Sequence, residues 1–123
     1  MVVIFSKDLT KTDIDTRLTL PMRALEHIRM PEGENNASVS CRYSNDGTEW
    51  TFRCYKRPNG HPKPAFTTGW LEFVRAKDLR IGDTVTFSMQ EDEAGGGGAA
   101  QYTIRAERTI RLLGTRIQTA VPI

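Results

Sequence analysis

The fold is decided within the stretch Phe66-Thr-Thr-Gly-Trp-Leu-Glu-Phe-Val-Arg-Ala-Lys-Asp-Leu-Arg-Ile-Gly-Asp-Thr-Val-Thr-Phe87. Its first half has a 3.6-residue period, and a start signal at Thr68 or Gly69 precedes it. A helix with this period places four residues on one side: Trp70, Phe73, Val74 and Lys77. After the Gly82-Asp83 turn the period changes to two. This alternation predicts a strand with one buried face, formed by Val85, Phe87 and Met89.

Apolar alternation predicts further strands along the chain, over residues 5–9, 38–44, 49–55, 101–107 and 109–113. Asn45-Asp46-Gly47 is a strong hairpin signal between the second and third of them. Met22, Leu25 and Ile28 recur at helical spacing after Pro21, which predicts a short helix over Pro21–Arg29 packed on the core. Residues 94–100 are glycine- and alanine-rich and predict a flexible connector. Six or seven short strands with two short helices favour a small barrel or sandwich.

Length and composition describe one ordinary globular domain. The chain has 123 residues, of which 38% are hydrophobic and 26% charged, enough for a single core. It contains no apolar run long enough to span a bilayer. The N-terminal apolar run, residues 1–5, is too short for a secretory signal. We therefore expect an intracellular protein.

The two cysteines, Cys41 and Cys54, share the apolar phase of neighbouring predicted strands. We interpret them as free, buried thiols. The alternative is a zinc site that they form with His27 and His61, but no close pair of these residues has the usual ligand spacing. We predict no metal and no cofactor.

The net charge of +2 is unevenly spread. Residues 53–63 carry four cationic side chains and no carboxylate, and residues 105–116 carry four arginines against Glu107. Glu91-Asp92-Glu93 is the acidic counterweight. Basic loops on a nearly neutral chain suit a polyanion that is bound at one face. A solvated surface of mixed charge explains the same composition equally well.

Several separated motifs occur in an order that resembles the plant B3 DNA-binding domain. They are Lys7-Asp-Leu-Thr-Lys-Thr-Asp13, Arg17-Leu-Thr-Leu-Pro21, Trp50-Thr-Phe52, and Thr67-Thr-Gly-Trp70 followed by Gly82-Asp83. The resemblance covers roughly Phe5 to Leu113 and is strongest to the small, stand-alone members. It implies a mainly β fold: a seven-stranded open β-barrel, the DNA-binding pseudobarrel, with two short α-helices. On this basis residues 5–114 form the domain and residues 115–123 a C-terminal tail.

The resemblance also implies two loop arms that clamp the major groove of double-stranded DNA. The N-terminal arm matches residues 10–17 and the C-terminal arm residues 55–63. Lysine and arginine in these arms can contact phosphates, arginine a guanine edge, asparagine an adenine edge, and threonine a phosphate. The candidate DNA-binding residues are Thr10, Lys11, Thr12, Asp15, Thr16, Arg17, Lys56, Arg57, Asn59, His61 and Lys63.

Several conspicuous residues also have structural interpretations. Asp13 is better explained as a turn-former that holds the N-terminal arm than as a base reader. Arg53 lies inside a strand, where it can pair with a neighbouring carboxylate. Asn59-Gly60 suits a turn that needs a positive φ. The large aromatic residues are interpreted as core: Trp50, Trp70, Phe73 and Phe87.

The function that these observations favour is sequence-specific DNA binding by a plant transcription factor in the nucleus. Its partners would be double-stranded DNA and other transcription regulators, with no membrane and no small-molecule substrate. The alternative is a B3-fold protein-interaction module that has lost specific DNA binding. It is motivated by the N-terminal arm, where Lys7, Lys11 and Arg17 are balanced by three aspartates.

We do not expect an enzyme. The sequence has no Ser-His-Asp order, no paired catalytic carboxylates and no metal-ligand spacing. The fold also resembles the DNA-recognition domain of certain restriction endonucleases, but that domain itself only recognises DNA. Such a likeness of fold is a weak argument for chemistry.

Overall fold

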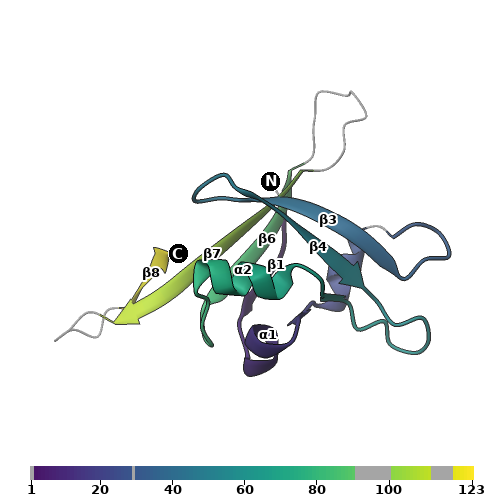
Figure 1. Ribbon diagram of the computed structural model, residues 1–123, viewed down its shortest axis with the longest axis horizontal. Coiled ribbons are helices and arrows are strands. Elements are labelled where there is room, and N and C mark those ends of the chain that lie inside the picture. The colour runs from purple at the N-terminus through teal and green to yellow at the C-terminus, as the bar shows by residue number, and fades with distance from the viewer. Residues whose placement is uncertain (1, 29, 91–100, 112–117) are drawn as a thin grey trace.

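One curled sheet of eight strands forms the body of the protein in a computed structural model that describes residues 2–28, 30–90, 101–111 and 118–123 (Figure 1). Its strand order is β1-β6-β7-β3-β4-β5-β2, and β8 pairs with β7. The strands are β1 (Val2–Asp8), β2 (Leu18–Thr19), β3 (Asn36–Tyr43), β4 (Glu49–Tyr55), β5 (Ala65–Phe66), β6 (Thr84–Gln90), β7 (Gln101–Arg111) and β8 (Gln118–Pro122). The helices are α1 (Lys11–Asp15), the 3₁₀-helix η1 (Met22–Glu26) and α2 (Trp70–Lys77). The expected open, mainly β barrel with two short α-helices is confirmed.

Helix α2 lies across the sheet (Figure 1) and buries Trp70, Phe73 and Val74. The rings of Trp70 and Phe73 lie 5.7 and 5.5 Å from the ring of Phe52 on β4, both edge-on. Such aromatic pairs add to the free energy gained by burying apolar area. The 3.6-residue period therefore predicted the helix and its buried side correctly.

The C-terminal end of α2 is held to the β3–β4 turn by Lys77. Its ammonium lies 4.2 Å from the centre of the Tyr43 ring and 2.6 Å from a carboxylate oxygen of Asp46. The hydrogen bond from Lys77, with further ones from Thr48, lowers the pKa of Asp46 to about 2. This contact fixes the helix to the hairpin as well as to the core.

The β3–β4 hairpin has the predicted inward face, with Val39, Cys41, Tyr43, Phe52 and Cys54 buried. Both cysteines are free thiols, and burial raises the pKa of Cys41 to about 12 and that of Cys54 to about 11. Cys54 lies opposite Ala37 rather than Cys41. Among the described residues no three His, Cys, Asp or Glu side chains are grouped so that they could hold a metal ion.

Two predictions about the C-terminal half are wrong. Residues 101–107 and 109–113 were expected as two strands, but β7 runs unbroken to Arg111 because its partner changes from β6 to β8 at Glu107. The period-two pattern also gave β6 one buried face, whereas Thr86 and Ser88 on the other face are buried too. β6 is paired on both sides, with β1 and β7, so neighbouring side chains shield these small residues.

The helix predicted over residues 21–29 is a 3₁₀-helix, η1. The Ala24 N–H donates to the Pro21 carbonyl at 3.0 Å, and the His27 N–H to the Ala24 carbonyl at 3.1 Å. These i→i+3 bonds define the 3₁₀ form. Ala24 and Ile28 face the core, so Met22, which was expected to be buried, is 50% exposed.

Strand β8 falls in the residues expected to form a tail. It pairs with β7 from Glu107 to Arg111, and the Ile123 carbonyl accepts hydrogen bonds from the Tyr43 hydroxyl and the Asn45 amide. The division at residue 114 stays a prediction. Residue 29, the acidic run 91–93, the connector 94–100 and the end of the strand expected over 109–113 lie outside the described residues. None of the described helices is long and apolar enough to cross a membrane.

The turn before α2 requires glycine. Gly69, the N-cap of α2, has φ +91°, and a Cβ there would lie 2.4 Å from the backbone oxygen of Thr51. The same turn is tied to β4 by hydrogen bonds from the Arg53 N–H to Thr68 and from the Thr67 N–H to Arg53. Only glycine accommodates both the left-handed backbone and the close approach of β4.

We expect Gly69→Ala to destabilise the protein by more than about 2 kcal/mol, because backbone strain of about 1–2 kcal/mol is added to the steric overlap. Gly82→Ala is the matched control, since Gly82 has φ +93° but nothing lies within 4 Å of its added Cβ. Urea unfolding measures both variants. Equal losses for the two would show that the contact with Thr51 does not matter.

Candidate nucleic-acid interface

The N-terminal arm, residues 10–17, was expected as a loop, and this is wrong. It contains the one-turn helix α1, because Thr10 and Asp13 form a capping box. The Asp13 N–H donates to the Thr10 hydroxyl oxygen at 3.4 Å, and the Thr10 N–H donates to the Asp13 carboxylate at 2.8 Å. The box satisfies N–H groups that a helix start otherwise leaves without partners.

Asp13 fixes this arm to the barrel, as the sequence predicted. Its fully buried carboxylate accepts hydrogen bonds from the Lys7 ammonium at 2.9 Å and the Thr19 N–H at 3.2 Å. Its backbone carbonyl accepts one from the Trp70 indole at 2.7 Å. Burial alone would raise the pKa of Asp13, but the hydrogen bonds from Thr10, Lys7 and Thr19 outweigh it and lower that pKa. Asp13 therefore joins the arm both to the barrel and to helix α2.

The C-terminal arm is a compact loop between β4 and β5. The Arg57 N–H donates to the Pro62 carbonyl at 2.6 Å, and the Lys56 N–H to the Asn35 carbonyl at 2.9 Å. Gly60 has φ +74°, as the turn at Asn59-Gly60 was expected to need. Lys63 has φ +42°, which is uncommon for a residue other than glycine. The arm is therefore closed by its own backbone hydrogen bond and attached to the residue before β3 by another.

The two arms meet through the shortest strands of the sheet. Leu18 pairs with Phe66 and Thr19 with Ala65, so β2 at the end of one arm lies beside β5 at the end of the other. A groove of about 760 Å³ lies between the arms. It is lined by Arg17, Thr19, Leu20, Pro21, Met22, Tyr55, Arg57, His61, Lys63, Pro64, Ala65 and Thr67. Four predicted residues are thus brought together: Arg17, Arg57, His61 and Lys63.

The cations of this groove are not neutralised by carboxylates of the described residues. Arg17, Arg57 and Lys63 are exposed, and no carboxylate of the described residues forms an ion pair with any of them. In the other basic stretch, by contrast, Arg105 pairs with Glu107 at 2.8 Å and Arg108 with Asp83 at 2.9 Å. The predicted second basic region is therefore partly neutralised within the fold.

The other predicted site residues do not line the groove. The Thr10 hydroxyl donates to Asp13 at 3.0 Å. Lys11 and Asp15 pair with each other at 2.6 Å, one helical turn apart, and the hydrogen bond from Lys11 to Asp15 raises the pKa of the lysine. The remaining ones lie on the arms outside the groove lining: Thr12, Thr16 and Asn59 are exposed, and Lys56 is half-buried.

Sequence reasoning missed the uncharged part of the groove wall. Pro21, Met22, Tyr55 and Thr67 line it, although the first two were assigned to a packed helix. The alternation along β4 places Cys54 on the buried face and Tyr55 on the exposed face. This pattern could have identified Tyr55 as a residue of the groove. Arg53 is also exposed on β4, opposite Ser38, and pairs with no carboxylate among the described residues, contrary to one interpretation.

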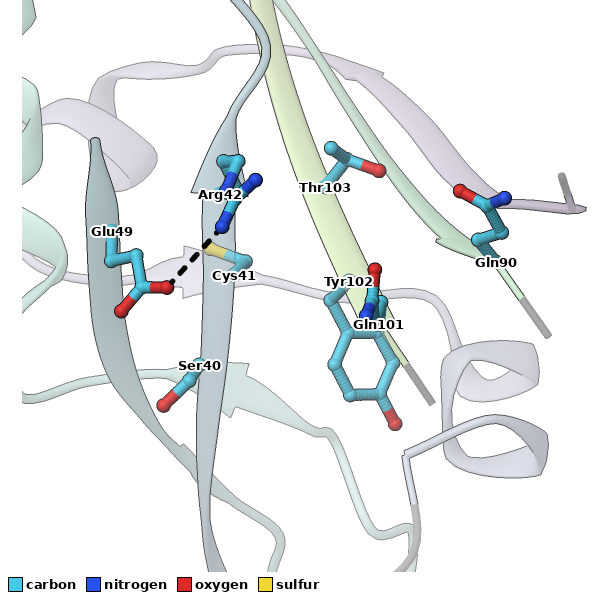
Figure 2. A pocket seen from close by; sticks show the side chains of 8 residues that line it. All are labelled: Ser40, Cys41, Arg42, Glu49, Gln90, Gln101, Tyr102 and Thr103. Atoms are coloured by element: carbon cyan, nitrogen blue, oxygen red, sulfur yellow. Dashed lines mark ion pairs between the residues drawn. The ribbon is translucent and has the colours of Figure 1, made fainter. Parts of the chain in front are cut away.

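A second hollow, of about 330 Å³, lies where β3 and β7 run parallel (Figure 2). Arg42 and Glu49, which are paired neighbours on β3 and β4, approach each other to 3.7 Å on one side of it. The other lining residues are Ser40, Cys41, Gln90, Gln101, Tyr102 and Thr103. It contains none of the predicted site residues. The groove between the arms is therefore the candidate interface.

Comparison with known families agrees with this geometry. The profile of the family described as "B3 DNA binding domain" matches residues 5–97, most of the sheet and both arms. The chain belongs to the B3 family. The resemblance deduced from the motifs is confirmed.

Two relatives and one solved structure define the likeness. This B3 domain is 32% identical over 126 residues to the AP2/ERF and B3 domain-containing transcription factor RAV1 of Arabidopsis thaliana, covering 93% of this chain and 36% of RAV1. It is 35% identical to the Arabidopsis B3 domain-containing transcription factor NGA4, covering 68% of this chain and 26% of NGA4. The Arabidopsis FUS3–DNA complex shares its fold, with a TM-score of 0.66 at 24% identity over 85% of this chain and 95% of that one. The chain spans about a third of RAV1 and a quarter of NGA4.

We expect Asp13→Asn to cost about 1.5–3 kcal/mol at pH 7, as for a hydrogen bond to a charged group. Because the pKa of Asp13 is lowered from 3.8, this stabilisation is present above about pH 4 and is lost as the pH falls through the lowered pKa. The difference between wild type and variant should therefore shrink in acid, as chemical unfolding at several pH values measures.

Asp15→Asn is the control for this B3 domain, because the pair of Lys11 and Asp15 is exposed and should be worth less than about 1 kcal/mol. An equal loss for Asp13→Asn and Asp15→Asn would contradict the role given to Asp13.

Proposed function

We propose that this B3 domain binds double-stranded DNA sequence-specifically through its two arms and acts in a plant transcription factor in the nucleus. The observation that carries the proposal is the groove in which Arg17, Arg57 and Lys63 meet without a neutralising carboxylate among the described residues. The family description and the transcription-factor relatives support it. The FUS3–DNA complex has the same fold, which supports DNA binding as compatible with this fold.

Binding would combine two kinds of contact. Cations and hydroxyl groups on the arms hold phosphates and set the register of the duplex. Arginine can also donate two hydrogen bonds to the O6 and N7 atoms of guanine, which is worth about 1–3 kcal/mol of discrimination. Arg17 and Arg57 come from different arms, so they can contact different base pairs. Other transcription regulators would join the complex through segments outside the groove.

The zero net charge of the N-terminal arm does not oppose this mechanism. Lys7, on β1, is paired with Asp13, and Lys11 is paired with Asp15, so these four charges are neutralised within the protein. Asp8 accepts a hydrogen bond from the Thr84 hydroxyl at 2.6 Å, away from the groove. Arg17 is the cation that remains, and it is the one that lines the groove. The arm can therefore be neutral as a whole and still be positive where it meets DNA.

The decisive experiment is selection of bound duplexes from a random pool, followed by measurement of the affinity for the enriched site against salt concentration. We expect a short enriched motif and a steep salt dependence, because each neutralised phosphate contributes about −0.9 to the logarithmic slope. No enrichment, with dissociation constants near the non-specific range of ~10⁻⁴–10⁻⁶ M, would favour the protein-interaction module instead.

Variants separate the roles of the groove cations. We expect Arg17→Ala or Arg57→Ala to weaken binding about 5- to 150-fold and to relax preference at one base pair, as for a lost bidentate contact. Lys63→Ala should weaken binding to all sequences alike and make the salt slope shallower by about 0.9. Lysine and alanine both have a Cβ, so the backbone strain at φ +42° is similar in the wild type and in this variant.

Arg75→Ala is the control for these variants, since Arg75 is exposed on α2 outside the groove. Repeated selection and salt titration of each variant provide the measurements. Unchanged affinity after replacement of Lys56, Arg57 and Lys63 together would remove the C-terminal arm from the mechanism.

A further inference from the structure

The groove between the arms has an apolar wall among its cations. Met22 is 50% exposed and Tyr55 38% exposed, and both line the groove with Arg17, Arg57 and Lys63. The other large apolar side chains that are exposed among the described residues lie outside it: Val2, Val3, Ile81, Ile110 and Val121. A bound partner that covers such an apolar side chain removes apolar surface from water, and this favours binding.

The backbone on both sides of Met22 is fixed. The Leu20 N–H donates to the carbonyl of Pro64, the residue that follows the C-terminal arm, at 2.9 Å. The Pro21 carbonyl accepts the first hydrogen bond of η1, from Ala24, and the Arg23 side chain donates to the Ile4 carbonyl of β1 at 3.3 Å. Met22 is therefore held between the arms and is not part of a loose loop.

We propose that Met22 reads the 5-methyl group of a pyrimidine, which in unmodified DNA is thymine. The inference rests on the proposed function, because the cations of the groove must first bring a duplex to it. The edges of base pairs in the major groove present hydrogen-bond donors and acceptors, and the methyl group of thymine is the apolar exception. A thioether side chain is flexible and polarisable, which suits contact with a single methyl group.

The role is one of specificity and is separate from phosphate binding. Arg17, Arg57 and Lys63 supply charge, which attracts any duplex. Met22 carries no charge and cannot contribute to the salt slope. Its contact would instead raise affinity only for sequences with a methyl group at one position, so base preference and salt dependence can be measured apart.

The test uses the duplex enriched by selection and replaces each thymine in turn by uracil, which removes only the methyl group. For the wild type we expect a loss of about three- to fivefold at one position, the worth of one buried methyl or methylene group. Met22→Ala should bind the thymine duplex with a similar loss and should no longer distinguish thymine from uracil there. Met22→Leu, which keeps an apolar side chain, should retain most of the difference.

Two controls accompany these measurements. Ile81→Ala removes an apolar side chain that is 64% exposed outside the groove and should leave every uracil effect unchanged. Duplexes with cytosine and with 5-methylcytosine at the sensitive position are compared, to test whether the methyl group is recognised on either pyrimidine. A gain with 5-methylcytosine in the wild type, absent in Met22→Ala, shows that the methyl group itself is recognised. Salt slopes should be the same for wild type and Met22→Ala.

The possible failures are distinct. If no duplex is enriched, the proposed function fails. If a duplex is enriched but neither uracil nor 5-methylcytosine changes the affinity at any position, the role of Met22 is wrong while DNA binding stands. Persistence of the full methyl effect in Met22→Ala also overturns it. Because Met22 is half-exposed, the variant should fold, and urea unfolding verifies this.

Discussion

Two residue pairs, Leu18 with Phe66 and Thr19 with Ala65, bring the arms together. Each arm is organised by its own local hydrogen bonds, but without the β2–β5 pairing neither would lie at a set distance from the other. The pairing is secured by burial, because Leu18, Phe66 and Ala65 are all core residues. An interface that is open to solvent thus owes its width to some of the most deeply buried side chains of the protein.

The distribution of ion pairs explains which cations are available to a ligand. Lys7, Lys77 and Arg108 each stabilise the fold by joining one element to another, and their carboxylate partners belong to turns or to a helix start. The cations of the groove have no such partner among the described residues. A count of charges along the sequence cannot separate these two populations, since the pairing partners of Lys77 and Arg108 lie 31 and 25 residues away.

The parts of the fold that could be predicted are those in which the buried face is long enough for the apolar pattern to repeat several times. Helix α2 and the β3–β4 hairpin repeat their apolar pattern over two or more turns or pleats, so the sequence was sufficient. Strands β2 and β5 have two residues each and are too short to show any period. For η1, the large apolar residues Met22, Leu25 and Ile28 were assigned to the buried side, but the residues that are buried are Ala24 and Ile28. The small side chain of Ala24 gave no apolar signal, and this led to the wrong position for Met22.

The candidate site was predictable in kind but not in extent. The residues of the arms identified the chemistry, and Asp13 was correctly interpreted as the residue that holds the N-terminal arm, although the capping box that it forms was not foreseen. Which of eleven candidates meet in one groove depends on tertiary pairing and could not be read from the sequence. The uncharged wall was missed for the same reason, because the segment before η1 is brought beside the end of the C-terminal arm by a tertiary hydrogen bond from Leu20 to Pro64.

The parallel pairing of β3 with β7 has a consequence for the order of folding. Cys41 to Tyr43 pair with Tyr102 to Ile104, about sixty residues further along the chain, whereas the β3–β4 hairpin closes over a short turn. Closing the longer loop costs more chain entropy and gains few contacts until the segments between are ordered. We therefore expect the hairpins to form first and the barrel to close late, with the two arms taking their final positions only after closure.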